Sequence, residues 1–317
     1  MERQKKNLIL AATLGVIFIL GFLINDPFLI FETSYEKSKP VIASRLERVK
    51  KITVLDGTSK RTFTRTTDGW ALDNAAGTGV LRADSEKIES GLKNLFEARR
   101  YQEVSSNKEK QGEYEVRDND FQIQLDGERS EKIAHAYLGK YSPSGSSSFI
   151  RLAGENAVYA VKGFLKGDWN QDIDQYRDHS ILKIAKENIK RIEVSGKNSF
   201  ALKASDTGEL VLDPPRATDK ARVSTYASEI SEFNGQKFFR EPKLPPSYGK
   251  IKITLSAGIT KEIEFFGPIA NQEFVVKSTD MNEPLTTAKS KVDNLFPRLE
   301  DLVDKAGAPQ LVVPPQK

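Results

Sequence analysis

The side chains best suited to chemistry gather in GDWNQDIDQYRDHS, residues 167–180. Asp168, Asn170, Asp172 and Asp174 stand at alternating positions there, and one of the two histidines of the chain follows them. Read from Asp168, these oxygen-bearing side chains take the first, third, fifth and seventh positions of an EF-hand calcium loop. Three interpretations are open: a metal site, an acid–base cluster, or a polar connector between two folded parts.

The calcium template fails at two of its demanding positions. An EF-hand loop needs glycine at its sixth position for a sharp turn and a bidentate glutamate at its twelfth. Ile173 and His179 stand there instead. Isoleucine resists the left-handed backbone that glycine adopts freely, and histidine is a poor ligand for a cation that prefers oxygen. We therefore interpret the stretch as a connector without metal, whose Trp169 and Tyr176 pack against the folded parts.

The rest of the chain contains no motif for catalysis or cofactor binding. G-x-S-x-G, P-loop, H-E-x-x-H and strand-associated G-x-G-x-x-G patterns are all missing, and there is no cysteine. His135 lies in the alternating IAHAYLG, which is typical of a strand face, and His179 next to Asp178 suggests a charge pair at a helix start. KYSPSGSSS, from Lys140, indicates a serine-rich hairpin loop. The sequence predicts no catalytic, cofactor-binding or metal-ligating residue, and hence no enzyme.

Length and composition limit the elements that position these residues. The 317 residues suffice for about two domains, and 38% hydrophobic with 29% charged residues is typical of a soluble body. The net charge of +4 is spread along the chain, so nucleic-acid binding has little electrostatic support.

The N-terminus indicates a membrane anchor. Arg3, Lys5 and Lys6 precede the uncharged run Leu8–Ile24, which would span about 25 Å as a helix, near the lower limit for a bilayer. No small-residue cleavage site follows, which favours an uncleaved anchor over a signal peptide. Because basic flanks stay in the cytoplasm, we expect a single-pass protein of the cytoplasmic (inner) membrane. Its C-terminal body would lie in the periplasm or outside, and membrane lipid would contact its N-terminal helix.

Two copies of one pattern follow the anchor. VKKITVLDG, from Val49, matches IKRIEVSGK, from Ile189, and each copy continues with two short strands and an amphipathic helix. FQIQLDG then matches IKITLSAG, and IAHAYLGKY matches KEIEFFGPI. The fold class is therefore α+β, with two tandem repeats after the transmembrane helix, each an antiparallel sheet with a packed helix.

The helices of the two copies have recognisable caps. In the first, Asp84 or Ser85 precedes a stripe that begins at Ile88, and in the second Thr218 or Asp219 precedes one that begins at Val223. The predicted organisation is a cytoplasmic stub and anchor (1–31), a linker (32–45), repeat one (46–168), a connector (169–184), repeat two (185–305) and a flexible tail (306–317). The residues expected to hold these parts together are Trp70, Trp169, Tyr176, Arg177 and Asp178.

An ordered set of segments resembles a known bacterial family. It comprises the N-terminal anchor, DGWAL, ADSEKIESGLKNLFEARRYQEV, YLGKYSPSGSSSFIRLAGENAVYAV and YRDHSIL, and the resemblance covers most of residues 45–290. The family is a domain of unknown function that accompanies gliding-type (Gld-like) ABC transporter components. Its motif before the second repeat, W/Y-R-D/S-x-x-I/L, is matched here by Tyr176, Arg177, Asp178, Ile181 and Leu182.

The resemblance implies partners but no activity. Such proteins are similar to membrane-anchored extracytoplasmic partners of an ABC-2-type permease, its ATPase and a Gld-like auxiliary subunit, and any ATP hydrolysis would belong to a partner. Our leading hypothesis is a non-enzymatic accessory subunit of such a transport or surface-assembly complex. A periplasmic glycan- or peptidoglycan-binding module and an unrecognised hydrolase are the alternatives. Genes for an ABC permease and ATPase beside this one would favour the first.

Overall fold

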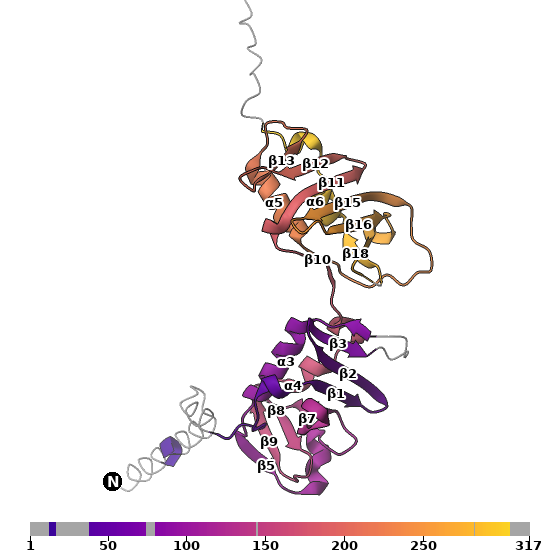
Figure 1. Cartoon of the computed structure of the whole chain (residues 1–317). Coiled ribbons are helices and arrows are strands. Elements are labelled where there is room, and N and C mark those ends of the chain that lie inside the picture. The colour runs from indigo at the N-terminus through magenta and orange to yellow at the C-terminus, as the bar shows by residue number, and fades with distance from the viewer. Residues whose placement is uncertain (1–12, 17–37, 74–79, 144, 282, 305–317) are drawn as a thin grey trace, which may run out of the picture. The chain divides into compact units, whose positions relative to one another are not determined.

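The chain forms an α+β protein with two antiparallel sheets and a few short helices (Figure 1). The computed structural model describes residues 13–16, 38–73, 80–143, 145–281 and 283–304. They divide into two compact units, Met1–Arg177 and Asp178–Lys317, which we call unit 1 and unit 2. Each unit has a hydrophobic core of its own.

Unit 1 is built on a nine-stranded antiparallel sheet with the order β4-β3-β2-β1-β6-β7-β8-β9-β5. The alternation of the sequence decides which face each side chain takes, so that Ile52 and its cross-strand neighbours Phe63 and Leu125 all enter the core. The strands are β1 (Lys51–Asp56), β2 (Ser59–Thr66), β3 (Gly69–Asp73), β4 (Val80–Arg82), β5 (Gln102–Ser105), β6 (Gln122–Asp126), β7 (Lys132–Tyr141), β8 (Ser147–Leu152) and β9 (Val158–Lys162).

Helix α3 (Ser85–Glu97) seals the core of unit 1 against one face of this sheet. Asp84 accepts a hydrogen bond from the backbone N–H of Lys87, which confirms it as the predicted cap. The predicted apolar stripe is buried at Ile88 and at the positions one and two turns later. The remaining helical segments are η1 (Leu46–Arg48), η2 (Lys108–Tyr114), η3 (Glu128–Ser130), α4 (Leu165–Trp169) and η4 (Ile173–Tyr176).

The opposite face of this nine-stranded sheet, which we call sheet 1, carries a smaller apolar cluster and a polar stripe. Val116 and Tyr137 belong to this cluster, with Tyr114 of η2 packed against it. Beside them, the pairing places Thr62, Thr53, Gln124 and His135 opposite one another on successive strands. This face is therefore polar and uncharged along one row and apolar where η2 packs on it.

Unit 2 contains a seven-stranded antiparallel sheet with the order β13-β12-β11-β15-β16-β17-β18, and β10 pairs separately with β14. Helix α5 (Lys220–Ser231) starts after Asp219, whose side chain accepts from the Arg222 N–H and is the predicted cap. The strands are β10 (Ser180–Lys183), β11 (Ile189–Gly196), β12 (Phe200–Ala204), β13 (Leu210–Asp213), β14 (Glu232–Asn234), β15 (Ser247–Leu255), β16 (Thr260–Phe266), β17 (Glu273–Ser278) and β18 (Leu285–Ala288). The other helical segments are η5 (Lys186–Asn188), η6 (Ala270–Gln272), α6 (Lys289–Leu295) and η7 (Leu299–Asp301).

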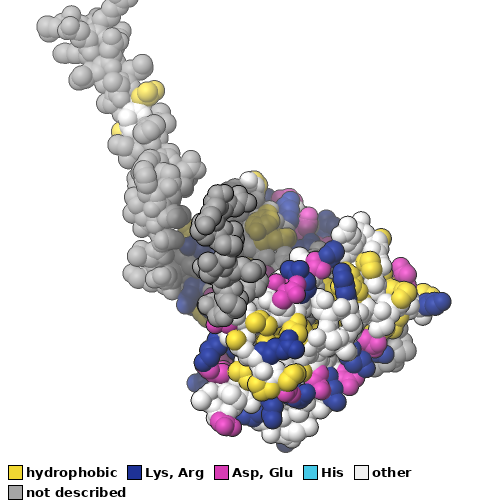
Figure 2. All heavy atoms as spheres, turned by 90° about the horizontal axis from the view of Figure 1, so that it is seen from above, with side chains coloured by type: hydrophobic (Ala, Val, Ile, Leu, Met, Phe, Trp, Pro, Cys, Tyr) yellow, Lys and Arg dark blue, Asp and Glu magenta, His cyan; other side chains and the backbone are white. Residues whose placement is uncertain are grey.

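Charge pairs run across the sheet of unit 2 on the face away from its core. Arg191 contacts Asp213 and Glu193, and Lys250 lies 3.2 Å from Glu262. Exposed pairs of this kind contribute little stability each, but they keep a sheet face soluble. Figure 2 shows the same intermixing of basic and acidic side chains over the surface in view.

Two parts of the predicted organisation fall partly or wholly outside the described residues. Apart from Thr13–Val16, the expected span Leu8–Ile24 is not described, nor is the tail from residue 305. Among the residues that the structure does describe, no helix is long and apolar enough to cross a membrane. The end of the predicted linker is described, and there Val41 and Ile42 are buried in the core of unit 1.

Candidate functional site

The segment that opens the sequence analysis folds into unit 1 as far as Arg177. It begins within the one-turn helix α4 and continues through the short helix η4, and its Trp169 and Tyr176 enter the core beside Leu165, the first residue of α4. The predicted connector 169–184 is therefore not a solvated crossing over its first nine residues. The aromatic rings make the difference, because burying them outweighs the preference of the neighbouring acids for water.

Trp169 and Tyr176 meet around Phe63 of β2. The ring centroids lie 6.1 Å and 5.4 Å from that of Phe63, both with edge-on geometry. Trp169 also lies on Gly91 of α3, where an added Cβ would stand 2.9 Å from the indole ring. Helix α3, the segment and the sheet are thus joined by two aromatic side chains that are each 1% exposed.

The hydroxyl of Tyr176 closes the segment on itself. It donates to the backbone carbonyl of Asp168 at 3.0 Å and accepts from the N–H of Gln171 at 3.1 Å. Burial raises the pKa of Tyr176 to about 12, so the phenol stays protonated and keeps donating. Lys87 and Arg61 lie 5.3 Å and 5.8 Å from its ring and also bind Gln171 through its side-chain and backbone oxygens.

The acids of the segment bind separate partners and do not converge on one point. Asp168 accepts from the Asn94 amide at 2.9 Å, and Asp172 caps η4 by accepting from the N–H of Asp174. Asp174 lies 3.3 Å from Arg177. Within the described residues, no group of three or more histidine, cysteine or acidic side chains is placed to hold a metal ion.

Trp70 occupies a second aromatic position in unit 1. Its indole N–H donates to Glu89 of α3 at 2.8 Å, and the guanidinium of Arg65 lies 4.5 Å from its ring. The Ser85 hydroxyl accepts a hydrogen bond from the backbone N–H of Trp70, and a Cβ on Gly69 would stand 2.2 Å from that hydroxyl oxygen. Glycine is therefore required at the turn that presents Trp70 to the start of α3.

Arg177 and Asp178 stand on either side of the division between the two units. Arg177 is 6% exposed and pairs with Ala83 of unit 1 in an isolated bridge. Asp178 accepts from the N–H and hydroxyl of Ser180 and so starts β10. The prediction that His179 forms a charge pair at a helix start is wrong about the element, because a strand begins there, and its ring lies 4.9 Å from that of Phe238.

A polar cluster around Arg151 on β8 was not singled out in the sequence. The Arg151 side chain is 4% exposed and donates to the carbonyls of Val116 and Glu155 and to the Asp118 carboxylate at 2.6 Å. Its guanidinium lies 3.9 Å from the ring of Tyr137. A lone arginine in an alternating strand gives no signal of this kind, because two of its partners, Val116 and Asp118, come from a segment about 35 residues away.

Three pKa values in and beside this cluster are shifted. Burial raises the pKa of Tyr137. Hydrogen bonding and charge attraction from Arg151 lower the pKa of Asp118. Burial, and then the nearby charges of Lys132 and Arg151, lower the pKa of His135, which is hydrogen-bonded to Gln122 at 2.8 Å.

We expect His135 to make unit 1 less stable in mild acid. The pKa of His135 is lower than 6.5 in the folded state, so the unfolded state binds more protons at pH values between the folded pKa and 6.5. The free energy of unfolding therefore falls as the pH drops from above 6.5 through the folded pKa. His135→Gln should remove this fall. Both tryptophans lie in unit 1, so urea unfolding followed by their fluorescence at several pH values measures it without interference from His179. An equal pH slope in the parent and the variant would contradict the assignment.

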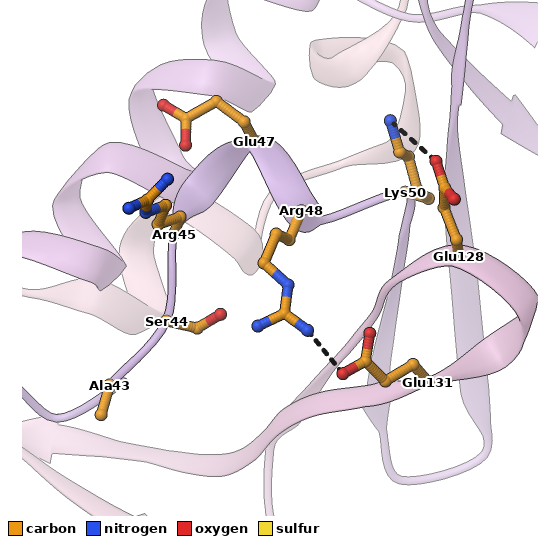
Figure 3. A pocket seen from close by; sticks show the side chains of 8 residues that line it. All are labelled: Ala43, Ser44, Arg45, Glu47, Arg48, Lys50, Glu128 and Glu131. Atoms are coloured by element: carbon orange, nitrogen blue, oxygen red, sulfur yellow. Dashed lines mark hydrogen bonds and ion pairs between the residues drawn. The ribbon is translucent and has the colours of Figure 1, made fainter.

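An open pocket of about 1010 Å³ lies where the chain enters unit 1 (Figure 3). Its charges are balanced and partly paired: Arg48 lies 2.5 Å from Glu131, and Lys50 lies 3.9 Å from Glu128. These are exposed pairs, which contribute little and leave the pocket without a preference for either sign of charge. The lining residues are Ala43, Ser44, Arg45, Glu47, Arg48, Lys50, Glu128 and Glu131.

The fold and these sites define an α+β protein made of two compact units with separate cores. A family model described as a domain of unknown function (DUF4340) matches residues 70–250, from β3 of unit 1 to β15 of unit 2. The match covers more than half of the chain, and the protein belongs to the DUF4340 family. No curated protein and no solved structure matches it. The matched span includes Trp70, Trp169, Tyr176, Arg177 and Asp178 and is shorter than the 45–290 of the expected resemblance.

Proposed function

We propose that the protein is a non-enzymatic, membrane-anchored extracytoplasmic accessory subunit of an ABC-2/Gld-like transport or surface-assembly complex. The observation that supports this best is the order of features along the chain. A basic N-terminus and an uncharged apolar run precede two folded units, so a protein inserted by that run would carry both units on the far side of the membrane.

The two units are, in this proposal, tandem copies of one module. The strand order β3-β2-β1-β6-β7-β8-β9 in unit 1 corresponds to β13-β12-β11-β15-β16-β17-β18 in unit 2. Helix α5 follows β13, and α3 follows β3 after one additional short strand, β4. Helices α4 and α6 each follow the last strand of the large sheet in their unit. Repeated modules of this kind suit a subunit that binds partners at more than one place.

The proposal is tested by isolating the full-length tagged protein from its own membranes in mild detergent. An ABC-2-type permease and its ATPase should be isolated with it, and their genes should lie beside this one. As a control, residues 1–31 fused to an unrelated soluble domain should bring down neither subunit. Membranes that contain the transporter while the isolated protein lacks it would count against the accessory role.

We also expect the N-terminal run to be retained in the mature protein. It has no small-residue cleavage site after it, and its uncharged length approaches that of a span. Intact-mass measurement on protein extracted from membranes should therefore give the full chain. Loss of about 25–30 residues would indicate a cleaved signal peptide and a soluble exported protein.

A further inference from the structure

A second pocket of about 600 Å³ lies at one end of sheet 1, against the C-terminal turn of α3. Its wall is formed by Tyr141, the last residue of β7, and by Phe164, which follows β9. The two rings are stacked with centroids 4.1 Å apart, and Tyr141 is still 45% exposed. An aromatic ring that is held by stacking and open to solvent is a preformed apolar platform.

Polar side chains surround this platform. Asn94 and Glu97 come from α3, Asp168 from α4, and Lys162 from the end of β9. Asn94 donates to Asp168, which fixes both groups, and the carboxylate keeps further acceptor sites. Glu97 lies 3.8 Å from Lys93 and is 65% exposed, so its carboxylate also remains accessible.

We propose that this pocket is a saccharide-binding site of unit 1. The face of a sugar ring presents weakly positive C–H groups, which match the negative face of an aromatic ring, while its hydroxyls need planar amide and carboxylate partners around the rim. The pocket supplies both, and its volume lies within the range of about 300–1,000 Å³ that is usual for small-molecule sites. With two carboxylates and one amine in its lining, it favours a neutral or amino sugar over an acidic one.

The site does not depend on the proposed accessory role. Its named side chains all belong to unit 1, so binding is expected whether or not a transporter accompanies the protein. Failure to isolate a permease would leave this inference standing, and failure to bind sugar would leave the accessory role standing.

The test is titration of the full-length protein with cellotetraose, maltotetraose and chitotetraose, followed by ligand-observed NMR. The detergent must not be a glycoside, because a sugar headgroup would compete for the site. We expect at least one oligosaccharide to bind with a Kd of about 1 mM or tighter. Tyr141→Ala should weaken that binding at least about tenfold, and Tyr141→Phe, which keeps the ring, should retain most of it.

Two further variants separate recognition from folding. Tyr101 is 46% exposed and is not among the lining residues, so Tyr101→Ala is a matched control that should bind like the parent. Asn94→Ala should weaken binding several-fold, with the unfolding transition of unit 1 retained by tryptophan fluorescence. Absence of binding by all three sugars up to about 10 mM, or equal weakening by Tyr101→Ala and Tyr141→Ala, would overturn the proposal.

Discussion

Replacing Trp169 with alanine is expected to lower the free energy of unfolding of unit 1 by about 3–5 kcal/mol. The ring is 1% exposed and lies between Phe63 of the sheet and Gly91 of α3, so its loss opens a cavity that rigid elements cannot fill. Urea unfolding of the full-length protein, followed by the fluorescence of Trp70, measures the change. Asp172→Asn is the matched control, because asparagine caps η4 as well as aspartate does and should change stability by less than about 0.5 kcal/mol.

The contact with Gly91 allows a sharper test of the same packing. Alanine in the middle of a helix usually stabilises the helix by about 1 kcal/mol relative to glycine. Gly91→Ala would therefore stabilise α3 if no side chain packed against this position. Here the new Cβ would stand 2.9 Å from the indole, and the substitution should destabilise unit 1 instead. In the Trp169→Ala background the sign should reverse. If Gly91→Ala were stabilising with Trp169 present, the indole would not lie against α3.

Two aspartate substitutions decide between the metal-site and connector interpretations of residues 167–180. Asp174→Asn should cost more than Asp172→Asn, because Asp174 faces the largely buried Arg177. Calcium should not change either unfolding midpoint. A calcium-dependent rise in the midpoint that the double substitution abolishes would restore the metal-site interpretation.

Local sequence patterns predicted those strands and helices whose formation depends only on the spacing of apolar and capping residues. VKKITVLDG and IKRIEVSGK became β1 and β11, and Asp84 and Asp219 became caps, because alternation and capping depend on residues a few positions apart. The α+β class with antiparallel sheets followed from the order of these elements.

Features that depend on distant residues could not be predicted in the same way. The aromatic pair at 169 and 176 was assigned to a connector because its neighbours are acidic, and only the fold shows that Phe63 and α3 enclose both rings. The pocket at Tyr141 combines the ends of strands β7 and β9 with the end of helix α3. Tyr141 stood in a segment interpreted as a serine-rich hairpin loop, which the hairpin between β7 and β8 confirms.

The buried Arg151 is the second position where a single change should have a large effect. Its guanidinium holds the carbonyls of Val116 and Glu155 and the Asp118 carboxylate to the sheet, and methionine would leave those acceptors without their donor. Loss of a buried, multiply bonded charge of this kind costs about 2–4 kcal/mol. Arg151→Met should therefore lower the urea midpoint of unit 1. Arg151→Lys should recover only part of the loss, because an ammonium cannot reproduce the planar fork that reaches three acceptors.

Proteolysis locates this effect in the molecule. The segment held by Arg151 contains Lys108, Lys110 and Arg117, so its release should expose these trypsin sites before the rest of unit 1 unfolds.

Acid should release the same segment in the parent protein. Arg151 lowers the pKa of Asp118, so the ion pair contributes its full stability above the ordinary pKa of 3.8. That contribution is lost as the pH falls through the lower pKa of the folded state. Asp118→Asn should remove that acid dependence while keeping the bond from Arg151 to the Val116 carbonyl. Cleavage of Arg151→Met at the same rate as the parent in this segment would show that other contacts, such as the packing of Tyr114 on Phe149 at 4.8 Å, hold it in place.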